Sequence, residues 1–288
     1  MKMTLLSVGH GFSARALARL LLDRGWRVIG TTRSAEKAEA LRGEGVDALV
    51  WPDAPLPLAD ATHLLVSVAP VGSGDPVLEL AGSQIGAARH LKWAGYLSTT
   101  AVYGDHKGGW VDETTPLAPT TERGKARARA ESAWAALGLP LHIFRLAGIY
   151  GPGRGPLAKV RRGTARRIVK KGQVFSRIHV EDIAAVLAAS IERPNPGAIY
   201  NVCDDSPSPP DDVIKHAARL LGLPVPPVVD LNSAEVSPMA RSFYAESKRV
   251  RNDRIKDELG VTLKHPDYRS GLAALLDAEA AGDSSNAR

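Results

Sequence analysis

The chain has 288 residues, of which 44% are hydrophobic and 5% aromatic, and its net charge is +6 at pH 7. This length suffices for one full core, or for one large domain and a smaller one. No apolar run approaches the roughly 18 residues of a membrane span, and the N-terminus reaches a glycine motif too early for a secretory signal. The composition therefore predicts a soluble, cytoplasmic protein without a membrane segment.

The single cysteine and the modest basic excess narrow the chemistry further. Cys203 has no second cysteine with which to pair, which fits a reducing compartment, and no Cys or His partners stand at metal-ligand spacing. We therefore expect no metal site. The positive charge favours anionic ligands, but no basic motif rich in aromatic residues is present, so we expect no nucleic-acid partner.

Strand-like and helix-like stretches alternate through the first two thirds of the chain, which predicts a parallel sheet with crossover helices. In chain order we expect strand 4–8, helix 13–24, strand 27–31, helix 35–42, strand 48–51, strand 63–69, helix 76–93, strand 96–100, helix 120–137 and strand 141–146. The fold class is therefore α/β, with a Rossmann-type, doubly wound parallel sheet.

After Gly148 the composition changes to Gly, Pro, Arg and Lys. We expect a β-hairpin across 166–178, as part of a basic hairpin insertion over 154–178, then helix 180–191, strand 198–202 and helices near 211–221 and 247–259. The predicted domains are a dinucleotide-binding domain over 1–203, a small C-terminal substrate lobe over 204–276 and a disordered tail over 277–288.

The stretch from Gly9 to Ala14 has the pattern G-x-G-x-x-A between a predicted strand and a predicted helix. Gly9 permits the tight turn, Gly11 lets the backbone approach a pyrophosphate, and Ala14 allows close packing of the helix on the strand. The phosphates would lie against the free N–H groups at the start of the helix. An ordinary glycine turn is the alternative interpretation.

The end of the second strand bears on the choice of dinucleotide. Sites for NAD usually carry an acidic residue there, which binds the ribose 2′-hydroxyl, but here the chain continues Thr31-Thr32-Arg33-Ser34. Arg33 is suited to a 2′-phosphate, so we expect NADP(H) in preference to NAD(H). A solvated surface arginine in a loop is the alternative interpretation. The full set of residues expected at the cofactor is Gly9, Gly11, Phe12, Ser13, Ala14, Thr32, Arg33, Ser67, Val68 and Ala69.

Four stretches together resemble the short-chain dehydrogenase/reductase superfamily, in its extended, epimerase-like branch, and within it the atypical YeeZ-like group. The resemblance covers residues 3–262. Besides the glycine turn, it is carried by Ser98-Thr99-Thr100-Ala101-Val102-Tyr103-Gly104, by Arg145-Leu146-Ala147-Gly148-Ile149-Tyr150-Gly151-Pro152-Gly153, and by Arg177-Ile178-His179-Val180-Glu181-Asp182.

The resemblance implies a catalytic Tyr-x-x-x-Lys pair, in which the lysine charge lowers the tyrosine pKa so that the phenol exchanges a proton while hydride moves to or from nicotinamide. Here Arg123 and Arg127 stand at the tyrosine and lysine positions. Arginine stays protonated, so neither side chain is a general acid or base. Lys125 is no substitute, since it lies about 200° around the helix from the lysine position.

Three residues are the candidates for catalytic roles. The resemblance assigns the hydroxyl that orients the substrate to Thr99 and leaves Arg127 to hold the nicotinamide ribose. Tyr103 is a candidate proton donor, with core packing as the alternative. The tentative substrate contacts are Thr100, Tyr150, Arg177 and His179, although Tyr150 also suits the core, His179 suits a structural role, and Asp182 suits a helix cap.

A basic segment follows the Tyr-Gly-Pro loop. It contains Lys159, Arg161, Arg162, Arg166, Arg167, Lys170 and Lys171. A cationic rim for a phosphate or carboxylate and a solvated surface are equally compatible with it. The expected partners are a small-molecule substrate of anionic character and, because extended relatives dimerise through the helices near 76–93 and 120–137, a second copy of the chain.

Three functions remain open. The first is an NADP(H)-dependent oxidoreductase or epimerase-like enzyme that acts on a small carbonyl or sugar-derived substrate without the usual Tyr-x-x-x-Lys pair. The second is a non-catalytic sensor or regulatory protein that retains the dinucleotide pocket. The third is an isomerase or dehydratase that uses a bound cofactor transiently.

Overall fold

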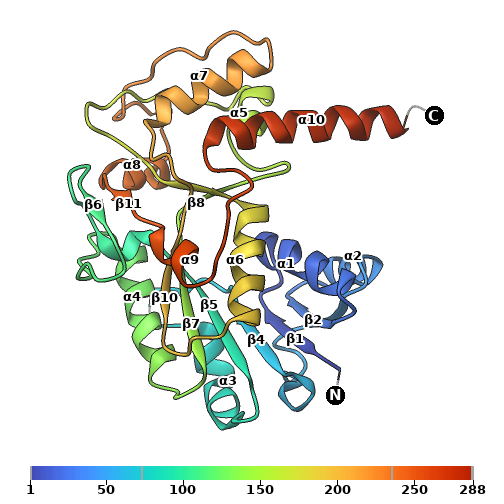
Figure 1. Ribbon diagram of the computed structural model, residues 1–288. Helices are drawn as coiled ribbons and strands as arrows, with labels where there is room; N and C mark the ends of the chain where they lie inside the picture. Colours follow the sequence, from blue (N-terminus) through green and yellow to red (C-terminus); the bar gives the residue numbers. More distant parts are fainter. Residues whose placement is uncertain (1, 73, 235, 287–288) are drawn as a thin grey trace.

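The computed structural model describes residues 2–72, 74–234 and 236–286, and its centre is a sheet of seven parallel strands in the order β10-β7-β5-β4-β1-β2-β3 (Figure 1). The strands are β1 (Thr4–Val8), β2 (Arg27–Thr32), β3 (Asp47–Val50), β4 (His63–Val66), β5 (Trp93–Thr99), β7 (Leu141–Leu146) and β10 (Ile199–Val202). Every residue of β1, β4 and β7 is buried, as expected for central parallel strands that helices cover on both faces. The α/β, Rossmann-like fold class is confirmed.

Helices cover both faces of the sheet. On one face lie α1 (Phe12–Asp23), α2 (Ala35–Gly43) and α6 (Val180–Glu192), and on the other lie α3 (Pro76–Ala87) and α4 (Glu122–Ala135). Leu17 and Leu21 of α1 share one apolar cluster with α6, whereas Ile85 of α3 and Trp134 of α4 belong to the cluster on the opposite face. The strand order reverses between β1 and β4, and α/β folds bind ligands at such a point, beyond the carboxyl ends of the strands.

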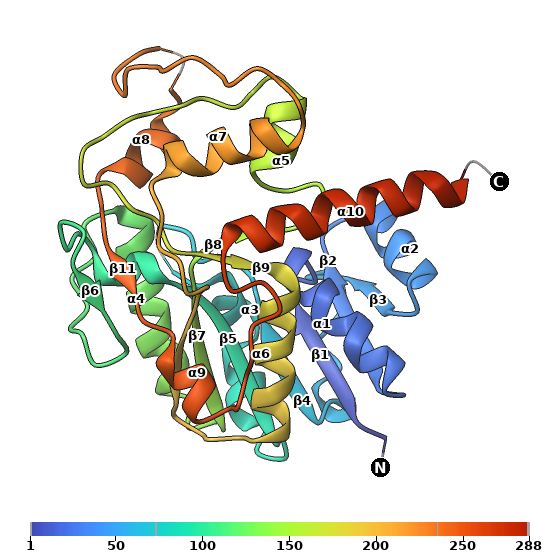
Figure 2. The same cartoon turned by 45° about the horizontal axis from the view of Figure 1, so that its top comes forward.

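A smaller lobe lies beyond that edge of the sheet (Figures 1 and 2). Its helices are α5 (Pro156–Arg161), α7 (Pro210–Leu220), α8 (Pro238–Tyr244) and α10 (Tyr268–Asn286). Between the sheet and the lobe lie η2 (Thr100–Tyr103) and two pairs of short strands: β6 (Trp110–Val111) with β11 (Arg249–Val250), and β8 (Gly148–Tyr150) with β9 (Arg177–His179). Two further short helices are η1 (Leu58–Asp60), between β3 and β4, and α9 (Asp253–Asp257), which contacts β10. No helix in the described part of the chain is long and apolar enough to cross a membrane.

The predicted hairpin over 166–178 is wrong. The chain does turn near Gly172, but its two arms separate: Arg167 bridges to Val228, Phe175 bridges to Ser208, and β9 pairs in parallel with β8. Apolar burial explains the separation, because Ile168 packs in a small cluster of the lobe and so cannot pair across the turn.

Three other predictions also need correction. The helix expected over 247–259 is a strand, β11, followed by the short helix α9. The helix expected over 76–93 ends at Ala87, and Trp93 begins β5 because its indole is fully buried in the core. Residues 277–286, predicted to be disordered, continue α10; residues 287 and 288 lie outside the described part.

Candidate functional site

The glycine turn joins β1 to α1 at the point where the strand order reverses. Gly9 has a φ of +79°, and a Cβ placed on it would lie 2.6 Å from Cγ2 of Val68, so a side chain is excluded on both grounds. Its N–H donates to Oγ1 of Thr31 at 2.8 Å, and its carbonyl accepts from the Ser67 hydroxyl. The turn is therefore held between the ends of β2 and β4.

Beyond the turn, α1 begins with unpaired backbone donors. Gly11 occupies the N-cap position of α1 and has no side chain that could accept a hydrogen bond. In α2, α3, α4, α6 and α8, by contrast, a side-chain atom of the N-cap residue accepts a hydrogen bond from a backbone N–H. The N–H groups of Phe12, Ser13 and Ala14 consequently have no intrahelical acceptor. A Cβ on Gly11 would meet only the Gly9 carbonyl oxygen, at 3.7 Å, so the chain is not crowded at the N-cap position itself.

Other residues expected at the cofactor lie around this turn. Ala14 is fully buried in the α1 face of the core, as close packing of helix on strand requires. Phe12 is partly buried, and the guanidinium carbon of Arg154 lies 5.2 Å from the centre of its ring. Val68 contacts the turn itself, and the neighbouring Ala69 is exposed after β4.

At the end of β2, Thr32 is partly buried and Arg33 is exposed. Within the described residues Arg33 makes no ion pair, and Ser34 caps α2 by accepting from the N–H of Lys37. His10 packs under this end of the sheet, where burial lowers its pKa to about 4, so the ring is neutral at pH 7. Because His10 is neutral, it adds no charge at the end of β2. Arg33, directly after β2, carries the positive charge next to the expected ribose site.

The two arginines that replace the Tyr-x-x-x-Lys pair have different surroundings. Nη1 of Arg127 donates to the carbonyl oxygen of Leu97 at 2.8 Å and to the Tyr96 hydroxyl at 3.1 Å, which links α4 to β5. Arg123 is exposed, and its guanidinium carbon lies 4.4 Å from the centre of the Phe243 ring of α8. Arg123 thus spans from the sheet domain to the lobe.

Thr99, the last residue of β5, and Thr100, the first of η2, line a cavity beneath the lobe. Oγ1 of Thr99 accepts from the N–H of Ala101 at 3.3 Å, which caps η2 and fixes the direction of the chain. The later residues of η2, Val102 and Tyr103, point into the protein core and are buried. Because of this short helix the two threonines face the cavity while Tyr103 does not.

Tyr103 is fully buried and does not line the cavity, which argues against its predicted role as proton donor. Its hydroxyl donates to Oδ1 of Asn201 at 2.7 Å and accepts from Nη1 of Arg145 at 2.9 Å. Burial raises its pKa to about 12. Arg145 in turn makes an ion pair with Glu131 at 2.8 Å, and the side chains of both are only 4% exposed. Sequence reasoning missed this network.

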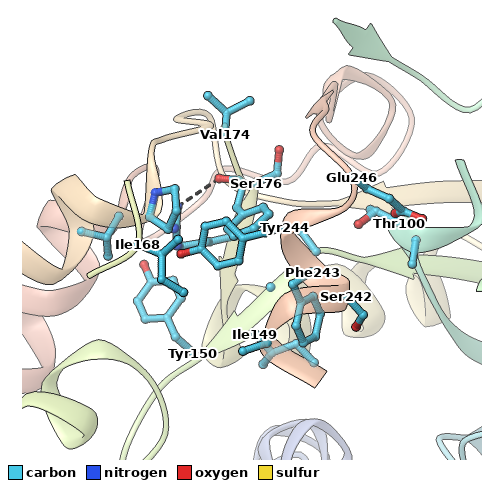
Figure 3. A pocket seen from close by; sticks show the side chains of 18 of the residues that line it. Thr100, Ile149, Tyr150, Ile168, Val174, Ser176, Ser242, Phe243, Tyr244 and Glu246 are labelled. Carbon is cyan, nitrogen blue, oxygen red and sulfur yellow. Dashed lines mark hydrogen bonds between the residues drawn. The ribbon is translucent and has the colours of Figure 1, made fainter. Parts of the chain in front are cut away.

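The cavity has a volume of about 550 Å³ (Figure 3). Figure 3 shows Tyr150, Phe243 and Tyr244 among its walls. Of the basic segment, Lys159 and Arg166 line the cavity, and the structure adds Arg123, Arg177 and Lys248 to its cations. Other cations of the segment are engaged elsewhere, for example Arg167 with Asp211 at 2.6 Å. The basic segment is therefore divided between the cavity lining and other contacts, and its role toward an anionic ligand stays a prediction.

His179 and Asp182 have structural roles at the start of α6. Nδ1 of His179 accepts from the N–H of Glu181 at 3.3 Å, so His179 is the N-cap, and burial lowers its pKa to about 4. Asp182, predicted as the cap, instead accepts from the N–H groups of Lys264 and His265 at 2.7 and 3.1 Å. Asp182 binds the segment that precedes α10 through these two hydrogen bonds. His179 contacts the same segment, because its ring lies 4.0 Å from the ring of His265, centre to centre.

A cluster of potential metal ligands also lies there, contrary to the sequence expectation. One ligand atom each from His179, Glu181 and His265 lies within 4.8 Å of the others. Two features oppose a metal: the bond from Glu181 N–H to Nδ1 of His179 places the proton of the neutral ring on Nε2, and the Lys264 ammonium lies 2.8 Å from the Glu181 carboxylate. Glu181 is thus engaged by Lys264 and His265, while Nε2 of His179 is buried without a hydrogen-bond partner in the described part of the chain.

The model of the NAD dependent epimerase/dehydratase family matches residues 8–203. Protein YeeZ of Escherichia coli K12 is 31% identical over 278 residues, which cover 90% of this chain and 95% of YeeZ. A conserved protein of unknown function from Silicibacter pomeroyi is 62% identical, with a TM-score of 0.93 over 96% of this chain and 99% of that one.

The human epimerase family protein SDR39U1, solved with NADPH, has the same fold at 18% identity, with a TM-score of 0.74 over 96% of this chain and 99% of the human one. The family match covers the glycine turn, Thr99 and Thr100, and the arginines Arg123 and Arg127 of α4. This chain therefore belongs to the NAD dependent epimerase/dehydratase family.

Proposed function

We propose that this protein is an NADP(H)-dependent oxidoreductase or epimerase-like enzyme that acts on a small anionic carbonyl compound. The observation that carries the proposal is the position of the uncapped start of α1 at the same edge of the sheet as Thr99 and Thr100, which open onto the cavity. A dinucleotide bound at such a turn extends from the glycines toward the substrate side of the strand ends.

The residues present fit a dinucleotide. The N–H groups of Phe12, Ser13 and Ala14 have no side-chain cap and the N-cap Gly11 is uncrowded, so an anion at this end of α1 would be stabilised by the N–H groups and by the helix dipole. Arg33 supplies a guanidinium for a 2′-phosphate where NAD sites usually carry an acid. Neighbours of the same fold were solved with either dinucleotide, the human protein with NADPH and two others with NAD, so the preference for NADP(H) rests on Arg33. When bound, the cofactor would supply or accept a hydride.

The side chains of this chain would position and polarise the substrate. A Thr99 or Thr100 hydroxyl would hold the carbonyl oxygen, and Arg123, charged at any relevant pH, would stabilise negative charge that develops on that oxygen. Arg123 cannot deliver a proton, and Tyr103 is sealed away from the cavity. The proton therefore comes from another group or from water.

A sensor that binds the dinucleotide without turnover is the second candidate. The specific observation in its favour is that arginines occupy both positions of the proton-transfer pair while Tyr103 is buried in a network of its own. NADPH consumption with small keto acids separates the two functions. Turnover that Arg123→Ala abolishes, with NADPH affinity retained, supports the enzyme; cofactor binding without turnover across the series supports the sensor.

Titration calorimetry with NADPH and NADH tests the cofactor assignment. We expect Arg33→Ala to weaken NADPH binding about tenfold, because a charge-assisted contact is lost, and to leave NADH binding unchanged. Arg19→Ala, which removes an exposed charge from the middle of α1, is the matched control and should affect neither. Equal losses for both dinucleotides in Arg33→Ala would show that Arg33 does not contact the 2′-phosphate.

A further inference from the structure

Arg177, on β9, is a partly buried cation that lines the cavity without a counter-ion. Its Nη1 donates to the carbonyl oxygens of Phe175 and Ser208 at 3.0 and 3.3 Å, which fixes the guanidinium. Nε and Nη2 have no protein acceptor in the described residues, and no described carboxylate lies within 4.0 Å of the group. These two nitrogens form the edge that binds a carboxylate through two parallel hydrogen bonds.

The acid nearest to Arg177 in the fold does not neutralise it. The N–H of Asp204 donates to the carbonyl oxygen of Arg177 at 2.6 Å, but the Asp204 carboxyl turns toward the N–H of Ser206, and its other oxygen is buried without a partner. Burial raises the pKa of Asp204 to about 8, so the group is largely protonated at pH 7. Arg177 thus has no ion pair among the described residues and lies in the lining of the cavity, where an anionic ligand would supply its partner.

The walls of the cavity around this cation are mostly apolar. The rings of Phe175 and Tyr244 meet edge to face, with centroids 5.4 Å apart, and Phe243 is 46% exposed although it is large and aromatic. Aliphatic side chains complete the walls: Ile149, Ile168, Val174, Val213, Ile214, Val236 and Val250. Such walls favour a flat apolar ligand body.

The polar groups of the lining are poorly suited to a sugar. The described lining contains no Asn, Gln, Asp or His. Oγ1 of Thr121 and Oγ of Ser237 accept from backbone N–H groups as helix caps, and Oγ of Ser176 accepts from the N–H of Val250. The carboxylate of Glu246 binds Thr120 and Lys248, so few acceptors remain for sugar hydroxyls.

We propose that the cavity binds an organic carboxylate with an aromatic or unsaturated apolar body, and that the free edge of Arg177 pairs with the carboxylate. This ligand class is the substrate class of the proposed enzyme, and the inference rests on that proposed enzymatic function. It also replaces the sugar-derived alternative, because a nucleotide sugar would place many hydroxyls against apolar walls.

Calorimetry of the full-length protein saturated with NADP⁺ tests the class with three probes. These are trans-cinnamate, its neutral isostere cinnamamide, and UDP-glucose. We expect cinnamate to bind at least about tenfold more tightly than cinnamamide, because only the carboxylate pairs with the guanidinium, and UDP-glucose not to displace cinnamate. Equal affinity for the acid and the amide, absence of cinnamate binding at millimolar concentration, or tighter binding of UDP-glucose would overturn the proposal.

Two variants test whether Arg177 is the cation that pairs with the carboxylate of the ligand. Arg177→Gln should lower cinnamate affinity about tenfold and leave cinnamamide affinity unchanged, while Arg162→Gln, an exposed site outside the cavity, should change neither. Equal losses for both probes would mean that Arg177 only shapes the cavity. If Arg177→Gln does not fold, the comparison of cinnamate with cinnamamide on the unaltered protein decides alone. NADP⁺ affinity, measured separately, shows whether the proposed function survives a failure of this inference.

Discussion

The buried ion pair between Glu131 and Arg145 should be a principal support of the sheet edge behind the cavity. Glu131 lies on α4 and Arg145 on β7, with Nη2–Oε2 and Nε–Oε1 distances of 2.8 and 3.2 Å. Ser98 of β5 also donates to Glu131. Although burial tends to lower the pKa of Arg145, hydrogen bonds with Glu131 and the charge of Glu131 raise it overall.

Glu131→Ala leaves the guanidinium buried without an acid, and such a loss typically costs about 3–5 kcal/mol of the free energy of unfolding. That is a large part of the roughly 5–15 kcal/mol that most domains possess. Urea denaturation followed by tryptophan fluorescence measures it, since Trp93 and Trp134 are both buried in the folded protein. The midpoint should fall while the slope stays constant.

Two controls make the result specific. Glu122→Ala removes an 83% exposed carboxylate from the same helix, and with it an ion pair with Lys125 at 2.9 Å, and should leave the midpoint nearly unchanged. Glu131→Leu combined with Arg145→Met removes both charges and should recover most of the loss. A loss below about 1 kcal/mol for Glu131→Ala would refute the reasoning, because the pair would then be dispensable.

Two further predictions concern buried polar groups. Tyr103→Phe should cost about 1–3 kcal/mol in urea denaturation, because both partners of the hydroxyl lose a hydrogen bond, yet leave turnover intact; loss of turnover in a stably folded variant would restore the donor hypothesis. Burial lowers the pKa of His10, His63 and His179 to about 4, so the unfolded chain binds more protons between about pH 4 and 6.5, and stability is lost as pH falls through that window. Asp204, whose pKa is raised to about 8, acts oppositely, since its folded form holds the extra proton. Because three groups oppose one, we expect a lower urea midpoint at pH 5 than at pH 7; an equal or higher midpoint would contradict these assignments.

The order of strands and helices in the sheet domain could be predicted from local patterns. The strands are short apolar runs, often bounded by glycines, and the helices between them show apolar residues at helical spacing. The predicted strand 141–146 coincides with β7, and the helix predicted over 180–191 is one residue shorter than α6. Such local patterns survive in the structure because the strands are buried on both faces. The G-x-G-x-x-A motif likewise lies between β1 and α1, as its spacing indicates.

The lobe and the polar network depend on contacts between distant segments and could not be predicted in the same way. Arg145 stands within an apolar strand, and its partner Glu131 is on a helix whose pattern shows only an ordinary surface acid. Phe243 and Lys248 reach the cavity because the chain near β11 crosses back to β6, a pairing with no local signal. The hairpin failed for the same reason, since tertiary burial of Ile168 outweighed the turn signal.

The most direct test of the central claim is calorimetric titration of NADPH into the cofactor-stripped protein and into Gly11→Val. A Cβ at Gly11 meets only the Gly9 carbonyl oxygen at 3.7 Å, and the φ of −101° suits valine, so the variant should fold with an unchanged thermal midpoint. Its side chain would occupy the space in front of the α1 donors. We expect clear NADPH binding to the parent protein and at least a tenfold loss of affinity in Gly11→Val. Unchanged affinity in a folded Gly11→Val variant, or no binding to the parent protein, would contradict the phosphate site and the proposed function with it.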